Sequence, residues 1–327
     1  MRLWVRLRGM RDNGLLDELV YIPGGLAQEL LPSPDEQVAL VERTFAAASS
    51  GRVQLPPKIP IHPRRETFIH AMPAYLADED VAALKWIGGS TLNRARGLPY
   101  LSGLIIVNDP ESGAVTAILE GAAITAARTA AVSALCIGRL GARSWQKVAI
   151  IGFGVQGVAH CELLRAMNPT AEFIVWNGGS NRSIPRLRRI EATISLSARE
   201  AVHDADVVIT SVPLARPAHP ILRPDWLKTA ALILPIDFDA TVGPSVVREA
   251  ALFVVDDIEQ FEYYRNLGHF TDWPSPDRSL ADSLGDVPPG QDRIVCCNLG
   301  VGSLDAAFAH SVLERAQRLG AGLRLPR

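Results

Sequence analysis

The 327-residue sequence lacks an excess of charge of either sign and lacks any long apolar run. Its 33 Lys and Arg nearly balance its 35 Asp and Glu, so the formal net charge is only -2. Without a basic field to hold phosphodiester backbones or anionic lipid, we expect neither nucleic acid nor a membrane surface as partner. No uncharged apolar stretch approaches the ~18 residues of a membrane-spanning helix, and the N-terminus has no continuous secretory apolar region. We therefore expect a soluble, cytoplasmic protein.

Paired metal-binding or redox motifs are also missing. The four cysteines show no C-x-x-C spacing, and the two at 296 and 297 are adjacent, which would strain a bridge between them. We interpret them as reduced thiols of a cytoplasmic protein. The histidines show no metal-ligand spacing either, so no metal is expected. By contrast, 48% hydrophobic residues against 21% charged ones exclude disorder as the dominant state. The length suggests two domains, although a single α/β barrel is also compatible with it.

The first third of the chain has the pattern of an α+β unit. Residues 1–17 look weakly structured. A helix is predicted with Ser33 as N-cap, proline at the first helical position and Glu36 three residues after the cap, and it ends by Gly51. Short apolar runs predict strands at 67–71, 82–87, 103–107 and 114–119. The last two runs meet across the turn residues Asn108–Gly113, which indicates antiparallel pairing.

After Gly121 the pattern changes to alternating strands and helices. An Ala-rich helix is predicted over 122–140, followed by the β-branched run 147–151, which is typical of a strand buried on both faces. Further strand-like runs lie at 173–176, 207–211, 231–236 and 252–255. This alternation predicts an α/β fold with a Rossmann-type, doubly wound parallel sheet. A final helix at 304–319 is expected to lie outside that sheet.

A glycine-rich motif follows the strand 147–151 and opens the next helix. It reads G-x-G-x-x-G, and its candidate cofactor-binding residues are Gly152, Gly154, Val155, Gln156 and Gly157. Glycines there allow a tight turn and close approach to a pyrophosphate at a helix N-terminus. Twenty residues later, where Asp or Glu usually meets a free ribose 2'-hydroxyl, the chain has Asn177, with Arg182 nearby. We therefore predict an NAD(P)(H) site and favour NADP(H).

Four further segments complete a recognisable pattern. They are Thr125–Ala131, Asn108–Gly113, Met72–Ala74 and Asn298–Asp305. With the glycine motif in this order, the chain from about residue 18 to 325 resembles the ornithine cyclodeaminase/mu-crystallin family. The resemblance implies a substrate-binding and dimerisation domain of residues 1–125 with 304–327, a Rossmann NAD(P)-binding domain of residues 126–303, and a homodimer.

The resemblance also implies hydride transfer between nicotinamide and the α-carbon of a small amino or imino acid. Three outcomes stay open. The first is an imine or ketimine reductase or an amino-acid dehydrogenase, the second is ornithine cyclodeamination to proline and ammonia, and the third is a mu-crystallin-like binding protein without turnover.

Residue by residue, Arg128 matches the family arginine that holds the substrate carboxylate, a role that suits a guanidinium fork. Lys85 matches the family's active-site lysine, which can transfer a proton to or from the imino nitrogen if it is partly desolvated. Thr129 is assigned to the cofactor site. Lys58 stands where the family commonly has arginine after a proline pair, and can still neutralise a carboxylate.

Two further candidates for contact with the substrate are His70 and an aspartate that follows a predicted strand. His70 lies where the ornithine-specific enzyme has a glutamate for the distal amine, and histidine cannot supply that fixed negative charge. Asp237 best matches the catalytic aspartate of the cyclodeaminases and lies at the carboxyl end of a predicted strand, where open α/β sheets bind ligands. Asp239 is the alternative. A buried carboxylate there could hold the substrate amine or act as a base.

Overall fold

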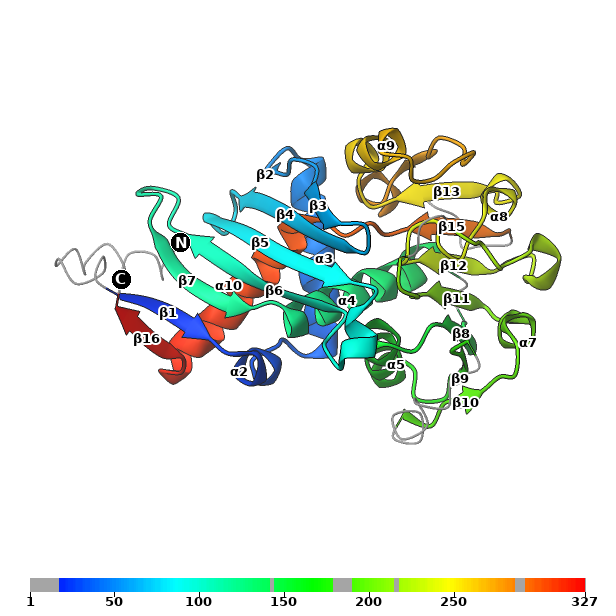
Figure 1. Ribbon diagram of the computed structural model, residues 1–327, viewed down its shortest axis with the longest axis horizontal. Coiled ribbons are helices and arrows are strands. Elements are labelled where there is room, and N and C mark those ends of the chain that lie inside the picture. Colours follow the sequence, from blue (N-terminus) through cyan, green and yellow to red (C-terminus); the bar gives the residue numbers. More distant parts are fainter. Residues whose placement is uncertain (1–17, 142–143, 179–189, 215–217, 286–291, 327) are drawn as a thin grey trace.

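The computed structural model describes residues 18–141, 144–178, 190–214, 218–285 and 292–326. Its helices and strands are organised around two eight-stranded sheets, one built mainly from the first 120 residues and one from residues 147–297 (Figure 1). The long helix α4 (Ala122–Leu140) joins them.

The first sheet is antiparallel except for one pair of strands. Its order is β16-β1-β7-β6-β5-β4-β2, with β3 also paired to β4, and β1 and β7 are parallel. The strands are β1 (Glu18–Ile22), β2 (Val53–Gln54), β3 (Ile59–Arg64), β4 (Thr67–Leu76), β5 (Val81–Ser90), β6 (Leu101–Asn108), β7 (Val115–Glu120) and β16 (Leu323–Pro326). The Asp109 carboxylate accepts from the backbone amide of Ser112, which confirms the turn between β6 and β7.

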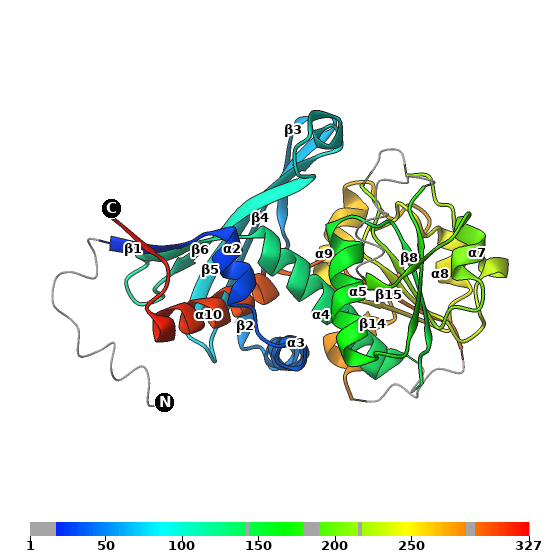
Figure 2. The same cartoon turned by 90° about the horizontal axis from the view of Figure 1, so that it is seen from below.

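Helices cover one face of this sheet. They are α2 (Gly24–Glu29), α3 (Pro34–Ser49) and α10 (Gly302–Leu319), and the short 3₁₀ helix η2 (Asn93–Arg96) follows β5. Figure 2 shows α3 and α10 on the same side of the sheet, where α10 packs against β4, β5 and β6. The Glu36 carboxylate accepts from the Ser33 amide at 2.7 Å, which confirms the start of α3. The last helix therefore returns to the first sheet, outside the parallel one, as expected.

All strand pairs of the second sheet are parallel within the described residues, which confirms the Rossmann-type fold. The order β10-β9-β8-β11-β12-β15-β13-β14 reverses direction on either side of β8, as in doubly wound sheets. The strands are β8 (Lys147–Ile151), β9 (Glu172–Trp176), β10 (Thr193–Ile194), β11 (Val207–Thr210), β12 (Leu232–Pro235), β13 (Leu252–Val255), β14 (Arg278–Ser279) and β15 (Ile294–Cys297). The helices are α5 (Val155–Met167), α7 (Ala198–Val202), α8 (Pro244–Arg248), α9 (Ile258–Asn266), η4 (Pro224–Trp226) and η5 (Ala281–Ser283).

Helix α4 holds the two halves together. Among the described residues it is the one helix long and apolar enough to cross a membrane, but 83% of that window is buried inside the protein, as in a core helix. Ser133 on α4 and His160 on α5 form a buried hydrogen bond of 2.9 Å.

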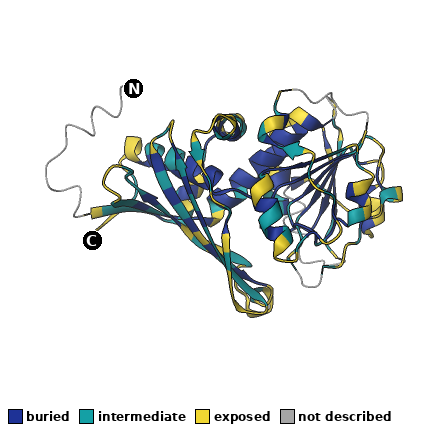
Figure 3. Cartoon of the chain, turned by 90° about the horizontal axis from the view of Figure 1, so that it is seen from above, coloured by how far each residue is buried: buried dark blue, intermediate teal, exposed yellow. Residues whose placement is uncertain are grey.

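The boundaries expected at 125/126 and 303/304 fall inside α4 and α10, so each of these helices spans a proposed division. Figure 3 shows buried residues filling both halves, whereas the end of the first sheet that carries β3 is exposed.

Candidate active site

A buried group of charges lies where β5, α4 and α10 meet. Asp305 on α10 accepts from Lys85 Nζ at 2.7 Å and from Arg128 Nε at 3.2 Å. Lys85 Nζ also lies 3.4 Å from Thr125 Oγ1. The exposed fractions are 1% for Lys85 and Asp305 and 7% for Arg128. Two cations therefore share one carboxylate, which leaves positive charge for an anionic ligand.

The strand register explains why a lysine is buried here. Lys85 pairs with Met72 on one side and Ile105 on the other, both of which are buried, whereas its neighbour Trp86 points to the opposite face and is 45% exposed. Burial, followed by the nearby Arg128 cation, lowers the pKa of Lys85 to about 7. Lys85 can therefore give or take a proton near neutral pH.

Lys58 is the third cation of the site. Its Nζ donates to the Leu299 carbonyl at 2.5 Å and lies 4.8 Å from the ring centre of Phe238 and 5.1 Å from that of Tyr264. Burial lowers the pKa of Lys58 to about 8, and the Asp256 carboxylate opposes that shift. The charge of Arg128 lowers the pKa of Lys58, and the charges of Arg128 and Lys58 both lower the pKa of Lys85. The structure thus brings the three cations close enough to act on one another.

The loop between β15 and α10 closes over this group. Gly300 has a φ of 86°, a conformation that favours glycine, and a Cβ at this position would lie 2.6 Å from Arg128 Nη1, so a side chain here would displace the guanidinium. Asp256 accepts from the Gly300 amide at 2.6 Å. The Gln260 side chain donates to the Gly300 carbonyl at 3.0 Å and accepts from the Lys58 amide at 3.2 Å.

Three residues of this group are not predicted from the sequence. They are Asp256, Gln260 and Asp305. Of the three, Asp305 alone stands in a segment that carries the family resemblance, Asn298–Asp305, but nothing in the linear sequence places it beside Lys85.

His70 lies on the edge of the site and carries no charge. Its ring is 4.8 Å from that of Phe68, and its Nε2 is 3.5 Å from Tyr264 Oη. Burial, and after it the charges of Lys58, His62 and Lys85, lower the pKa of His70 to about 3.

The two candidate aspartates after β12 are both engaged. Asp237 accepts from Thr210 Oγ1 and Thr241 Oγ1, each at 2.6 Å, and from the Val212 amide at 3.0 Å. Burial raises the pKa of Asp237 to about 6 despite these hydrogen bonds. Asp239 accepts from the Phe270 amide at 2.8 Å. The structure therefore places Asp237 in a threonine network at the carboxyl end of the sheet, while Asp305 is the carboxylate that contacts Lys85 and Arg128.

The glycine motif forms the turn from β8 into α5. Gly152 has a φ of 95°, and a Cβ there would lie 2.7 Å from the Ser211 carbonyl oxygen. Gly154 is the N-cap of α5, and a Cβ there would meet no atom within 4 Å, so this side of the turn is open. Asn177 accepts from the Phe153 amide at 3.1 Å. An open glycine turn at a helix N-terminus fits the pyrophosphate of a dinucleotide.

Two of the remaining cofactor candidates, Gln156 and Thr129, hydrogen-bond to the Thr125 carbonyl. Gln156 lies in the first turn of α5, and its side-chain amide donates to the Thr125 carbonyl at 3.5 Å, which links the motif to the buried charges. Thr129 donates to that same carbonyl at 2.7 Å, within its own helix. Gly157 lies in the first turn of α5. Arg182 lies outside the described residues.

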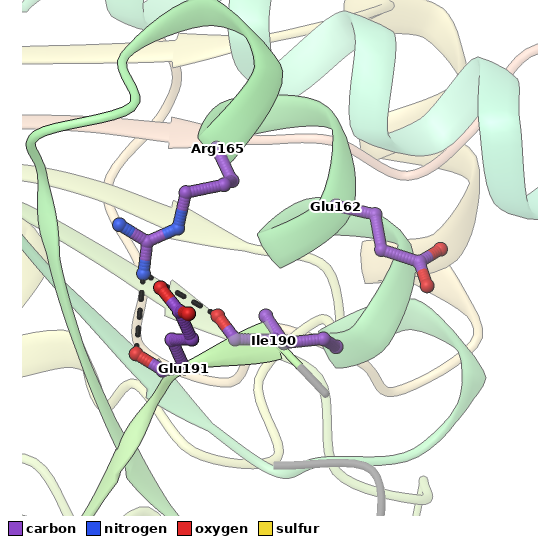
Figure 4. Close-up of a pocket in the computed structure, with 4 residues that line it drawn as sticks. All are labelled: Glu162, Arg165, Ile190 and Glu191. Atoms are coloured by element: carbon purple, nitrogen blue, oxygen red, sulfur yellow. Dashed lines mark hydrogen bonds between the residues drawn. The ribbon is translucent and has the colours of Figure 1, made fainter. Parts of the chain in front are cut away.

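Two cavities lie away from the charged group. One, of about 260 Å³, is lined by Glu162, Arg165, Ile190 and Glu191, and Arg165 donates there to the carbonyls of Ile190 and Glu191 (Figure 4). A groove of about 450 Å³ is lined by residues of α2, α3, α4 and α5 and includes Val155, which is 64% exposed. In the part of the chain that the structure describes, no group of three His, Cys, Asp or Glu side chains could hold a metal ion.

Both the sequence and the fold are similar to those of known proteins. Residues 27–298 match the ornithine cyclodeaminase/mu-crystallin family. The chain is 34% identical over 314 residues to the nodulation efficiency protein NfeD of Rhizobium meliloti, covering 88% of this chain and 95% of the relative. It is 27% identical over 241 residues to an alanine dehydrogenase of Archaeoglobus fulgidus, covering 72% and 73%. Its fold is similar to that of Thermococcus litoralis Δ1-pyrroline-2-carboxylate reductase in complex with NADH and L-proline, with a TM-score of 0.83, 25% identity and coverage of 93% and 99%.

Proposed function

The chain belongs to the ornithine cyclodeaminase/mu-crystallin family, and we propose that it is an NAD(P)-dependent imine reductase or amino-acid dehydrogenase acting at the α-carbon of a small amino or imino acid. The observation that carries this proposal is the group of Lys85, Arg128 and Asp305, which is linked to the glycine motif through the hydrogen bond of Gln156 to the Thr125 carbonyl. It combines an anion site with a proton donor whose pKa is about 7.

In the direction of reduction, the substrate carboxylate pairs with Arg128 and Lys58. Asp305 holds the Arg128 and Lys85 side chains in place. A bound nicotinamide would supply a hydride to the α-carbon. The electron pair of the C=N bond moves to nitrogen, which takes a proton from Lys85 Nζ. Oxidation of the amino acid reverses each step, and Asp237, held by its threonines, is proposed to lie near the amine.

For the cofactor, we propose NADP(H) in preference to NAD(H). Asn177 stands at the end of β9, where a carboxylate would repel a 2'-phosphate, and its side chain is occupied by the Phe153 amide. Gly152, Gly154, Gln156 and Gly157 would hold the pyrophosphate at the N-terminus of α5. The open turn at Gly154 supports the position of the pyrophosphate, which NAD(H) and NADP(H) share.

The proposed function is tested with a cyclic ketimine such as Δ1-pyrroline-2-carboxylate. We expect one NADPH oxidised per proline formed, and a lower kcat/KM with NADH. Ornithine should not yield proline and ammonia, a conversion that leaves no lasting change in nicotinamide absorbance. Asn177→Asp should reverse the cofactor preference, because its carboxylate repels the 2'-phosphate and accepts from a ribose hydroxyl.

The outcomes separate the alternatives. Proline and ammonia from ornithine would instead assign a cyclodeaminase. Ligand binding without turnover of either substrate would assign a binding protein. Tighter binding of NADH than NADPH by the unmodified chain would contradict the cofactor assignment alone.

We also propose a homodimer formed through the uncovered face of the first sheet. Trp86 lies directly opposite Ala71 on one strand and Leu104 on the other, and Ile59 pairs with Ala71, so these four side chains form one row on that face. Ile59, Trp86 and Leu104 are 55%, 45% and 40% exposed. An apolar row on the face opposite α10 is typical of a protein interface.

For this assembly, sedimentation equilibrium is expected to give the mass of two chains. Trp86→Glu should shift the mass to one chain, because it buries an unpaired charge on each side of the interface. Arg96→Glu, on η2, serves as a surface control that should leave the dimer intact. A single-chain mass for the unmodified protein would contradict the proposal.

A further inference from the structure

We propose that the substrate's side chain is uncharged and apolar, and that it lies against a wall formed by His70, Phe238 and Tyr264. We call these three residues the aromatic wall. The inference rests on the proposed hydride transfer and names the class of amino or imino acid that the site selects. Two observations carry it: the wall adjoins the cations that receive the carboxylate, and it presents no negative charge.

The strand register places His70 beside Lys85. Met72 pairs directly with Lys85, and His70, two residues earlier on β4, pairs with Ile87 on one side and Pro60 on the other. Residues two apart on a strand, and residues directly opposite each other, share a face of the sheet. His70 therefore lies diagonally next to Lys85 on the face that α10 covers, and the charges of both Lys58 and Lys85 act on it.

The other two members come from the second half of the chain: Phe238 follows β12, and Tyr264 lies on α9 and contacts His70 directly. The Lys58 ammonium lies over the rings of both Phe238 and Tyr264. These rings meet edge to face with centroids 5.3 Å apart, and Tyr264 meets the His70 ring at 6.2 Å. The aromatic wall thus begins at a cation that receives the carboxylate and extends toward β4.

Phe238 is held in an unusual backbone conformation. Its φ is 57°, in the left-handed region that a bulky side chain rarely adopts, and it is only 5% exposed. Its ring packs between Tyr264, Phe270 and His269. Strain of this kind persists where the surrounding structure enforces it and is concentrated at ligand sites.

A terminal ammonium on the substrate would be poorly accommodated here. His70 is neutral at physiological pH because its pKa is lowered to about 3. The ring faces of Phe238 and Tyr264 already carry Lys58, so a second ammonium would meet like charge instead of a free π face. Asp256, the carboxylate that most opposes the lowered pKa of Lys58, is buried and bound to the Gly300 amide. An apolar side chain meets none of these penalties and gains contact area.

The sharpest test compares amino acids that differ only in the terminal ammonium. L-norvaline and L-ornithine have equal chain lengths, as have L-norleucine and L-lysine. With the unmodified chain and NADP+, we expect kcat/KM for oxidation to be at least about 100-fold higher for the uncharged member of each pair, because the ammonium is left unpaired. L-glutamate should be as poor a substrate as ornithine.

Two variants assign the preference to the aromatic wall. His70→Glu supplies a carboxylate, and we expect it to shift the norvaline-to-ornithine ratio of kcat/KM toward ornithine by at least about tenfold. His70→Gln is the neutral control, and it should keep the ratio of the unmodified chain. Circular dichroism and melting temperature establish that both variants fold.

The kcat/KM ratios of the unmodified chain and of the His70 variants test different parts of the proposal. A ratio near one, or a preference for ornithine, lysine or glutamate, would overturn this inference while leaving the hydride transfer intact. If His70→Glu kept its turnover and its norvaline-to-ornithine ratio of kcat/KM, the aromatic wall would have no part in selecting the substrate. If the NADP+ complex neither turned over nor bound any of the five amino acids while the chain still reduced Δ1-pyrroline-2-carboxylate, this inference would be overturned and the proposed function would stand. Loss of the ketimine reduction as well would overturn both together.

Discussion

Replacing Lys85 by methionine is expected to lower kcat for imine reduction by about 10²- to 10⁴-fold, the range that a positioned proton donor contributes. Methionine keeps an unbranched apolar chain beside Met72 and Ile105 but removes the ammonium that donates to Asp305. Asp305 retains Arg128 as partner, so the site keeps one of its two ion pairs. The measurement is the steady-state rate of NADPH oxidation at saturating ketimine.

The pH profile separates proton transfer from charge. A lysine whose pKa is lowered to about 7 carries its proton below that pH and loses it above. The kcat/KM for reduction should therefore fall as the pH rises through about 7, and kcat/KM for oxidation should rise through the same region. Lys85→Arg keeps the positive charge but cannot release a proton, so it should bind substrate with little turnover.

Lys228→Met is the matched control. This lysine is 43% exposed and pairs with Asp206, which precedes β11 at the amino end of the parallel sheet, the opposite end from Asp237. Its loss should change kcat by no more than about twofold, since exposed ion pairs contribute little. If Lys85→Met kept kcat within threefold of the unmodified chain, Lys85 would have no part in proton transfer.

The sequence predicted the parallel sheet well because its strands are short, continuous apolar runs bounded by turns. It missed β15, although Ile294–Cys297 is buried between β12 and β13. Two cysteines in a four-residue run lack the β-branched pattern that marked the other strands. The strand expected at 67–71 instead continues to Leu76 through Pro73. Proline removes a backbone donor and normally argues against a strand interior, but pairing with β5 overrides that local preference here.

The cations of the site could be found from sequence, whereas their partners could not. Lys58, Lys85 and Arg128 stand in local motifs that the family resemblance marks. Asp305 pairs with a lysine 220 positions earlier, and that contact exists only because α10 returns to pack on β5. In a helix that also carries exposed charges, one aspartate has no local sign of being 1% exposed. Asp237 shows the converse, because its motif was visible but its threonine partners were not.

Arg128→Ala is expected to raise KM for the ketimine by about 100-fold, which corresponds to about 3 kcal/mol for a charge-assisted, bidentate contact. Gly300 leaves the Arg128 fork free of a side chain, while Asp305 fixes its Nε, so the two terminal nitrogens can turn to a carboxylate. Arg128→Lys should fall between, because an ammonium keeps the charge without the fork. The dissociation constant of NADPH, measured by fluorescence, should stay the same in both variants and reports an intact cofactor site.

Arg139→Ala, on the same helix α4, is the control for this substitution. Arg139 pairs with Glu42 and its side chain is 45% exposed, so removing it should leave KM within about twofold. Helical propensity cannot distinguish the two variants, since both place alanine in α4. A KM for Arg128→Ala equal to that of Arg139→Ala would mean that the substrate carboxylate is held elsewhere. A rise in KM confined to Arg128, with NADPH affinity kept, would assign the carboxylate to the buried guanidinium that Asp305 orients.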